Sequence, residues 1–328
     1  MKLHYFIGLV IVFINTTVLA LPSVEMTIKV TGENGQPIEG ATAGLSFSYT
    51  PSGGSPISSS DRGLTDSKGM FTGSGESIQT FNYWATKEGY YTTFKEFRLR
   101  KITGMVGFRR WEPWNQTIEV VLKKIKNPIA MYAYNMDQLT KTLPELPVLD
   151  RFVGYDLIAR DWVVPHGLGT HRDFLFKLER HAIKDYKNYN ITFTVAFENE
   201  GDGLQSYYVP VRGGSQLRMP HHAPTTGYES KLVINKASTS SEILSGKSRE
   251  DQNYFFRVRT ERDENGNITS ALYGKIHGSI GPAGFLDAKS KVRFNYYLNP
   301  TPNDTNIEFD PEKNLFKNLS VNEQVSTP

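Results

Sequence analysis

The sequence predicts an all-β protein of two β-sandwich domains, the second of them antiparallel and jelly-roll-like. Short segments in both halves of the chain alternate apolar and polar residues, the period expected of strands with one buried face. The 17 Tyr and 19 Phe residues favour strands over helices. No amphipathic pattern long enough for a three-turn helix stands out in the second half, so a second sandwich is the simplest architecture there.

Length and composition indicate a folded protein with enough chain for two domains. The 328 residues are 38% hydrophobic and 22% charged, which is typical of globular proteins and not of disordered ones. The formal charge is +3, and removal of the first twenty residues with Lys2 leaves 3 − 1 = +2, too little to indicate nucleic acid or an anionic membrane as partner. The chain has no cysteine, which excludes disulfides, a thiol nucleophile and cysteine-ligated metal.

Residues 1–20 have the pattern of a cleavable secretory signal peptide. Lys2 supplies the positive charge, Phe6 to Ile14 is an apolar run, and the chain has small or apolar residues before a cleavage site after Ala20. The alternative is a membrane anchor, but a spanning helix needs about 20 apolar residues, and polar residues from Asn15 to Thr17 interrupt this run. We therefore expect a periplasmic or extracellular protein with no transmembrane segment after cleavage.

The first domain is expected over residues 21–124 and opens and closes with an alternating strand. The first strand has one apolar face, formed by Val24, Met26, Ile28 and Val30. The closing strand shows the same alternation at Ile118, Val120 and Leu122. Between them lie turn-forming segments, in which Asp66 and Gly69 are expected to close a tight turn and Gly89 to take a backbone shape that a Cβ would resist.

Three of these segments carry a resemblance to a known family. Pro37-Ile38-Glu39-Gly40-Ala41, Thr65 to Phe71 (TDSKGMF) and Lys87 to Tyr90 (KEGY) follow the first strand in this order. The ordered set resembles the carboxypeptidase regulatory-like domain, a transthyretin-like, Ig-like sandwich of seven strands. That family is usually non-catalytic, so the resemblance implies a spacer or adhesion-type module.

The first domain departs from this pattern in a segment rich in aromatic and basic residues, Lys101 to Trp114. Arg109, Arg110, Trp111 and Trp114 fall in this insertion before the last strand. Aromatic residues and arginines are enriched at binding hot spots, so a ligand platform is one interpretation. Packing against the second domain is the other.

Prolines separate the two domains. Pro128, Pro144 and Pro147 interrupt regular structure and predict a linker over residues 125–148, with at most one short helix near Met136 to Leu143. The second domain is expected over residues 149–319, followed by a disordered tail over residues 320–328.

Strands recur in the second domain, and one hairpin has a definable register. Alternation is clearest over Ile191 to Phe197 and Val292 to Leu298. A three-residue loop ending in a left-handed Gly266 pairs Val258 with Leu272 and Tyr254 with Ile276, whereas a two-residue loop would mix apolar and charged groups on both faces. The chosen register predicts that one face of the hairpin is the more solvent-exposed. Its residues are Phe255, Arg257, Arg259, Ala271, Tyr273 and Lys275.

The second half also resembles uncharacterised bacterial secreted proteins. The resemblance rests on Asp251 to Thr260 (DQNYFFRVRT) and Tyr297 to Asp304 (YLNPTPND). No activity is attached to it, so it implies a shared fold only.

Candidate binding residues are aromatic side chains assigned to loops, whose flat faces can stack on sugars or anchor a protein. They are Trp111, Trp114, Trp162 and Tyr207. No nucleophile elbow, zinc signature or cofactor loop is present, so no catalytic residue and no cofactor is assigned. The favoured function is therefore a non-enzymatic binding or structural protein with a glycan or cell-envelope partner.

The alternative is a secreted metal-dependent hydrolase with its site in the second domain. His166, His171 and Asp173 share one glycine-bearing segment, and His221-His222 could complete a set of metal ligands with one open position. The spacing matches no known motif, and polar loop residues beside a strand are the favoured explanation. Stoichiometric zinc in the purified protein would favour the hydrolase.

Overall fold

The structure is a computed structural model that describes residues 21–51, 54–105, 108–136, 143–209, 213–245, 251–286 and 289–328. Every regular element in these ranges is a strand, which confirms the predicted all-β sandwich class. The predicted signal peptide and most of the short helix predicted near Met136 to Leu143 lie outside the described residues. Within the described ranges no helix is long and apolar enough to cross a membrane.

The described chain divides into two compact units. The first holds the chain up to Thr31 together with residues Pro37–Trp84 and Glu96–Val120. The second holds Gly32–Gln36, Ala85–Lys95 and everything from Val121 onward.

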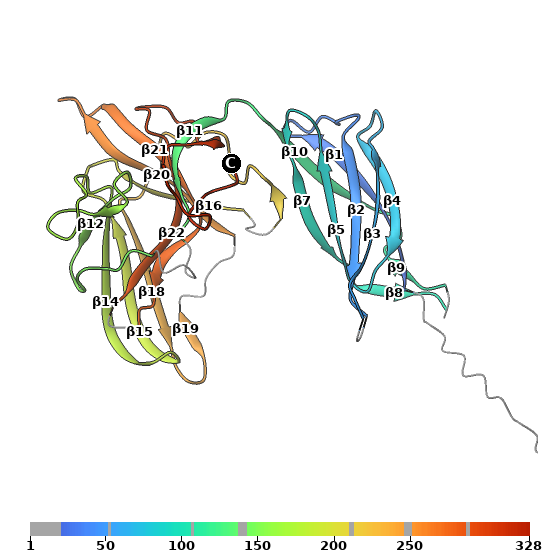
Figure 1. Ribbon diagram of the computed structural model, residues 1–328, viewed down its shortest axis with the longest axis horizontal. Helices are drawn as coiled ribbons and strands as arrows, with labels where there is room; N and C mark the ends of the chain where they lie inside the picture. The colour runs from blue at the N-terminus through green and yellow to red at the C-terminus, as the bar shows by residue number, and fades with distance from the viewer. Residues whose placement is uncertain are drawn as a thin grey trace, which may run out of the picture. The chain divides into compact units, whose positions relative to one another are not determined.

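Two sheets build the N-terminal sandwich (Figure 1). One has the order β6-β10-β1-β9-β8, with β4 also paired to β1. Its strands are β1 (Ser23–Gly32), β4 (Met70–Glu76), β6 (Tyr90–Tyr91), β8 (Lys101–Thr103), β9 (Arg110–Glu112) and β10 (Gln116–Lys124). The other has the order β17-β7-β5-β2-β3. Its strands are β2 (Thr42–Tyr49), β3 (Ile57–Leu64), β5 (Thr80–Thr86), β7 (Thr93–Arg98) and β17 (Gly214–Ser215).

The predicted first strand and the predicted turn at Asp66 to Gly69 are both confirmed. The alternating apolar side chains of β1 from Val24 to Val30 are all at most 1% exposed. The Asp66 carboxylate accepts hydrogen bonds from the backbone N–H groups of Lys68 and Met70. Gly69 has φ +74°, and a Cβ on it would lie 2.4 Å from the carbonyl oxygen of Val30. The turn therefore needs glycine at this position.

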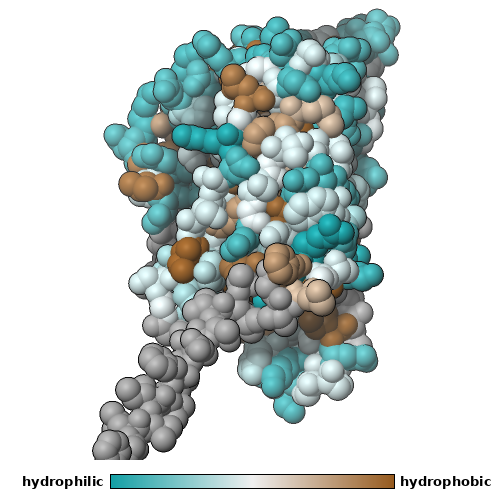
Figure 2. Space-filling view, turned by 90° about the vertical axis from the view of Figure 1, so that its right-hand side faces the viewer, coloured by the Kyte–Doolittle hydropathy of each residue, from teal (hydrophilic) through white to brown (hydrophobic). Residues whose placement is uncertain are grey.

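Figure 2 shows one face of the molecule, where hydrophobic residues lie singly or in small groups among hydrophilic and intermediate ones. Exposed large apolar side chains on the first unit include Leu64, Met105 and Phe108. Scattered apolar residues of this kind are normal on a protein surface.

The C-terminal sandwich consists of two six-stranded sheets (Figure 1). The first has the order β13-β12-β14-β15-β18-β19. Its strands are β12 (Val153–Asp156), β13 (Asp161–Trp162), β14 (Phe174–Asp185), β15 (Asn188–Ala196), β18 (Lys231–Ser238) and β19 (Ile243–Ser245). The second has the order β16-β20-β21-β22-β11-β23. Its strands are β11 (Ile129–Tyr134), β16 (Gly203–Tyr208), β20 (Gln252–Arg262), β21 (Ile268–Ala283), β22 (Lys291–Leu298) and β23 (Phe309–Asn314).

An aromatic core includes side chains from both sheets. Phe174 and Phe176 of β14 meet Phe294 of β22 with ring centroids 5.5 and 5.6 Å apart, and Phe256 of β20 lies 5.3 Å from Phe174. Each of these side chains is at most 1% exposed. Burial of one large apolar side chain contributes about 1.5–3 kcal/mol, so this cluster stabilises the pairing of the two sheets.

The predicted hairpin register is confirmed, whereas the predicted solvent exposure of one face is wrong. β20 pairs Tyr254 with Ile276 and Val258 with Leu272, and Gly266 has φ +81°. The residues on the other face are buried as well: Phe255, Arg257, Ala271, Tyr273 and Lys275 are each at most 6% exposed. A second apolar cluster that includes Met219 and Ile307 covers this face, so the sheet is buried on both sides.

The structure differs from the predicted linker and tail. Residues 125–148 contain β11, whose backbone pairs with β22 and β23 in the second sheet. Burial of its apolar side chains explains why this segment is a strand and not a linker. In the predicted disordered tail, Glu323 accepts a hydrogen bond from the Tyr134 hydroxyl through its side chain and one from the Asn135 N–H through its backbone. These contacts hold the tail segment on β11.

Candidate functional site

Two of the predicted binding residues are core residues. Trp111 lies on β9, is 6% exposed, and donates its indole N–H to the Ser77 carbonyl at 2.9 Å. Trp162 lies on β13, is 6% exposed, and packs edge-on against Tyr155 and Phe176. Both lie on strands and not on loops, so neither presents a ring face to a ligand.

The other two predicted residues are more accessible. Trp114 is 37% exposed, and the Arg110 guanidinium lies 5.5 Å from its ring centroid. Tyr207 lies on β16, half-buried, with its ring 5.2 Å from that of Phe255. Trp114 is thus the one of the four that resembles a surface platform.

The structure does not assemble the predicted metal ligands into one coordination site. Asp173 is 2% exposed and fully engaged by other groups, whereas His166 and His171 are exposed. His221 is buried, and its Nε2 lies 2.8 Å from the Lys124 carbonyl oxygen. No group of three or more His, Asp or Glu side chains suited to a metal ion occurs in the ranges that the structure describes.

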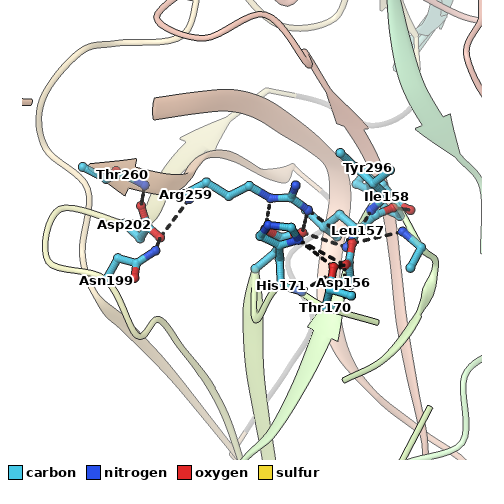
Figure 3. A network of polar contacts seen from close by, with 12 residues as sticks. Asp156, Leu157, Ile158, Thr170, His171, Asn199, Asp202, Arg259, Thr260 and Tyr296 are labelled. Carbon is cyan, nitrogen blue, oxygen red and sulfur yellow. Dashed lines mark hydrogen bonds and ion pairs between the residues drawn. The ribbon is translucent and has the colours of Figure 1, made fainter. Parts of the chain in front are cut away.

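The second unit instead contains a buried network of three carboxylates and one arginine, which we call the Arg259 network: Asp156, Asp173, Asp202 and Arg259. The Arg259 guanidinium contacts Asp173 twice, at 2.7 Å from Nε and 2.9 Å from Nη2, and contacts Asp156 at 3.2 Å. Figure 3 shows the Arg259 side chain extending from the Asp202 end of the network to the Asp156 end. This bidentate geometry is the strongest form of arginine–carboxylate pairing.

Asp156 organises the segment that follows β12. Its Oδ1 accepts the backbone N–H groups of Ile158 and Ala159, and its Oδ2 accepts those of Thr170 and His171. Burial raises the pKa of Asp156, but these N–H donors and the charge of Arg259 outweigh that effect and lower its pKa to about 2. Asp156 is therefore an ionised structural anchor near neutral pH.

Asp173 and Asp202 have the opposite shift. Burial raises the pKa of Asp173 above its ordinary value, against the hydrogen bonds and charge of Arg259. Burial likewise raises the pKa of Asp202, against hydrogen bonds from Thr260, Asn199 and Arg259. The lone pairs of all three carboxylates thus serve protein donors.

The network supports an irregular backbone. The β20–β21 register shifts between Val258 and Glu261, and Arg259 has φ +56°, which is uncommon for a residue other than glycine. The Asp202 carboxylate accepts the backbone N–H groups of Arg259 and Thr260 at 3.0 and 2.9 Å. Carboxylates therefore hold both the backbone and the side chain of this bulge.

Two pockets adjoin the bulge and share Glu198 and Asn199 on their walls. We call them together the polar cleft. The first has a volume of about 490 Å³ and is lined by residues 170–173, 198–199 and 259–261. The second has a volume of about 660 Å³ and is lined mainly by residues 197–202 and 225–228 with Arg257 and Arg262. Both volumes are in the range of small-ligand sites.

The walls of the second pocket are tied together by Arg257. Its Nε donates to the Gly201 carbonyl at 2.7 Å and its Nη1 to the Thr225 carbonyl at 2.8 Å. Its guanidinium lies 4.8 Å from the Tyr228 ring centroid. The two wall segments, 197–202 and 225–228, are thereby held at a fixed separation.

The charges of the cleft are mixed and mostly paired. Arg172 and Glu198, both about half exposed, form an ion pair at 3.1 Å at its rim. Glu200 is 88% exposed at the side chain and 4.0 Å from Arg262. The cleft therefore offers hydrogen-bond donors and acceptors of both signs without a large excess of either charge.

Sequence reasoning missed these residues. Asp156, Asp202 and Arg259 come from three distant segments and carry no motif, and the bulge at Arg259 interrupts an otherwise regular strand pattern. Only the unusual density of polar residues from Glu198 to Asp202 was visible in the sequence.

Comparisons with known proteins assign no family. No family model and no curated protein matches the chain. Among solved structures, it is similar to 3-chlorocatechol 1,2-dioxygenase from Rhodococcus opacus 1CP, with 10% identity, 33% of this chain and 62% of that chain covered, and a TM-score of 0.25. Catechol 1,2-dioxygenase from Pseudomonas arvilla C-1 has 14% identity, covers 35% and 56%, and has the same TM-score.

A third solved structure is the shaft pilin SpaA from Lactobacillus rhamnosus GG. It has 10% identity, covers 87% of this chain and 94% of that chain, and has a TM-score of 0.22. The chain spans less than two thirds of either dioxygenase. TM-scores this low give no support for a shared function, so the functional argument rests on the site itself.

Proposed function

We propose that the protein is a non-enzymatic binding protein whose second unit recognises a neutral oligosaccharide in the polar cleft. The observation that carries the proposal is that the Arg259 network uses its buried carboxylates to hold the cleft wall. Carboxylates saturated by arginine and backbone donors are poorly suited to proton transfer, whereas a wall fixed in advance lowers the entropy cost of binding.

The chemistry of the cleft supports a polyhydroxylated ligand. Sugar hydroxyls both donate and accept hydrogen bonds, and the shared wall presents a carboxylate at Glu198 beside an amide at Asn199. Two adjoining pockets with a common wall suit a ligand of two or more sugar units. Strongly anionic or cationic ligands would find no matching excess of charge.

The predicted first domain, residues 21–124, is proposed to be a spacer of the carboxypeptidase regulatory-like type. The family-like segments fall at turns of a β-sandwich, including the Asp66 to Gly69 turn. Trp114 with Arg110 is a secondary candidate contact for an envelope partner.

Export to the periplasm or extracellular space belongs to the same proposal. Cleavage after Ala20 would give a mature protein that begins at Leu21. N-terminal sequencing of exported material tests this step, and a retained Met1 would contradict it.

The binding proposal is tested on an oligosaccharide array followed by titration with the best-bound sugar. Asn199→Ala is expected to weaken binding at least fivefold, about 1 kcal/mol. Asn265→Ala, in an exposed turn of the same unit that lines neither pocket, is the matched control and should bind like the wild type.

Product analysis of the same sugars separates binding from hydrolysis. Bond cleavage that disappears in a folded His166→Ala/His171→Ala variant would replace this proposal by the hydrolase. Equal affinity of Asn199→Ala and wild type would remove the cleft as the site.

A further inference from the structure

Lys275 lies in the second sheet of the C-terminal sandwich, which is buried on both faces. Lys275 is in the middle of β21, where Phe255 of β20 and Tyr297 of β22 lie opposite it on either side. It is 0% exposed, and its Nζ lies 4.7 Å from the Tyr297 ring centroid. Among the described residues, this Nζ has no hydrogen-bond partner. A buried amine without such a partner is energetically unfavourable.

His277, two residues further along the same face of β21, likewise has a buried nitrogen that lacks a hydrogen-bond partner among the described residues. Its ring lies 4.6 Å from the Tyr297 ring, and its Nδ1 is 2.9 Å from the Tyr297 hydroxyl. Its Nε2 is buried and has no hydrogen-bond partner within the described chain. If the Tyr297 hydroxyl donates to Nδ1, the neutral ring carries its proton on Nε2, which then offers a second buried donor beside the Lys275 amine.

The surrounding charges are predominantly positive. Burial is the main cause that lowers the pKa of Lys275 to about 7; the charges of Lys123 and Arg218 act in the same direction, and that of Glu308 opposes them. Burial and the charge of Lys275 also lower the pKa of His277 well below its ordinary value. The Glu308 carboxylate already accepts the backbone N–H groups of Lys126 and Asn127. Two basic side chains, Lys123 and Arg218, thus act on Lys275 against the single carboxylate of Glu308.

We propose that Lys275 Nζ and His277 Nε2 form an internal site for a small monovalent anion such as a halide. Two buried N–H donors on one strand face, both beside the Tyr297 ring and in a positive field, are the complement of a small anion. The bound ion pairs with the lysine ammonium and satisfies both nitrogens. The site is independent of the polar cleft and of the function proposed for it.

The first experiment is a crystal of the wild-type protein grown in bromide, because it does not depend on a variant. An anomalous difference peak within hydrogen-bond distance of Lys275 Nζ and His277 Nε2 is expected. No peak at this position overturns the proposal.

The second experiment compares thermal unfolding in chloride and in gluconate, which is too large for the site, at equal ionic strength. Chloride at ten times its Kd is expected to raise the Tm of the wild type by about 3 °C. Lys275→Met should lose this difference, whereas Lys289→Met, at a lysine whose side chain is 75% exposed, should keep it. A bromide peak without any chloride effect on the wild-type Tm means an adventitious ion only and overturns the proposal.

Discussion

Replacement of Arg259 by methionine should destabilise the protein strongly and in a pH-dependent way. The variant leaves the Asp173 carboxylate, whose side chain is 0% exposed, with the Leu157 N–H as its remaining donor in the network. Removal of one partner of a buried ion pair costs roughly 3–5 kcal/mol. Because the Arg259 side chain is still 21% exposed, we expect a value near the lower end, about 3 kcal/mol.

The pH dependence follows from the carboxylate left behind. Without Arg259, burial alone raises the pKa of Asp173 above its unfolded-state value of 3.8. A folded-state pKa above the unfolded one means that the folded variant binds the proton more tightly, so its stability relative to the wild type improves as pH falls toward 4. The gap between wild type and variant should therefore be widest near pH 7 and narrow on acidification.

Urea unfolding at pH 7 and pH 4.5 measures both effects. Arg172→Met is the matched control, since the Arg172–Glu198 pair is about half exposed on each side and should cost less than about 1 kcal/mol. Adding Asp173→Asn to Arg259→Met should recover part of the loss, because the buried charge is then gone. A loss no larger than that of Arg172→Met, unchanged with pH, would refute the structural role of the network.

Two further predictions concern backbone strain and the buried lysine. Gly69→Ala should cost about 3 kcal/mol in urea unfolding and Gly89→Ala only about 1–2 kcal/mol, since both have positive φ but only the first would place a Cβ against the Val30 carbonyl; equal losses would contradict this. In gluconate, wild-type stability should rise from pH 7 to about 10, because Lys275 has a folded-state pKa of about 7 against 10.5 unfolded and the folded protein binds fewer protons in that window. Lys275→Met should remove this slope, worth up to about 5 kcal/mol, and an unchanged slope would show that Lys275 is not its source.

Local periodicity and turn chemistry predicted individual strands and the register of one hairpin. The alternation from Val24 to Val30 identified β1 and its buried face, and the left-handed turn at Gly266 fixed the register that pairs Val258 with Leu272. Both results depend on residues that are close in sequence, where the period of two and the chemistry of one turn decide the outcome.

Local periodicity did not predict which strand faces are buried or which residues line the site. Lys275 and Arg257 mark a strand face as polar in the sequence, yet segments far along the chain, including Met219 and Ile307, cover that face. Trp111 and Trp162 are predicted to lie on loops, but short strands bury both. Long-range packing decides these outcomes, and single-sequence patterns contain little of it.

The same limit explains why the Arg259 network was not foreseen. Its carboxylates lie at the end of β12 and in the segments just before β14 and β16, and they meet only after the sandwich has formed. The nearby histidines predict Asp173 as a metal ligand, whereas its actual partner, Arg259, is remote in sequence.

Hydrogen-exchange mapping with the best-bound sugar shows whether the polar cleft binds an oligosaccharide. Binding in the cleft should slow amide exchange over residues 197–202 and 225–228 and leave the first unit unchanged. Protection confined to the segment around Trp114, or protection nowhere in the second unit at saturating sugar, would contradict it.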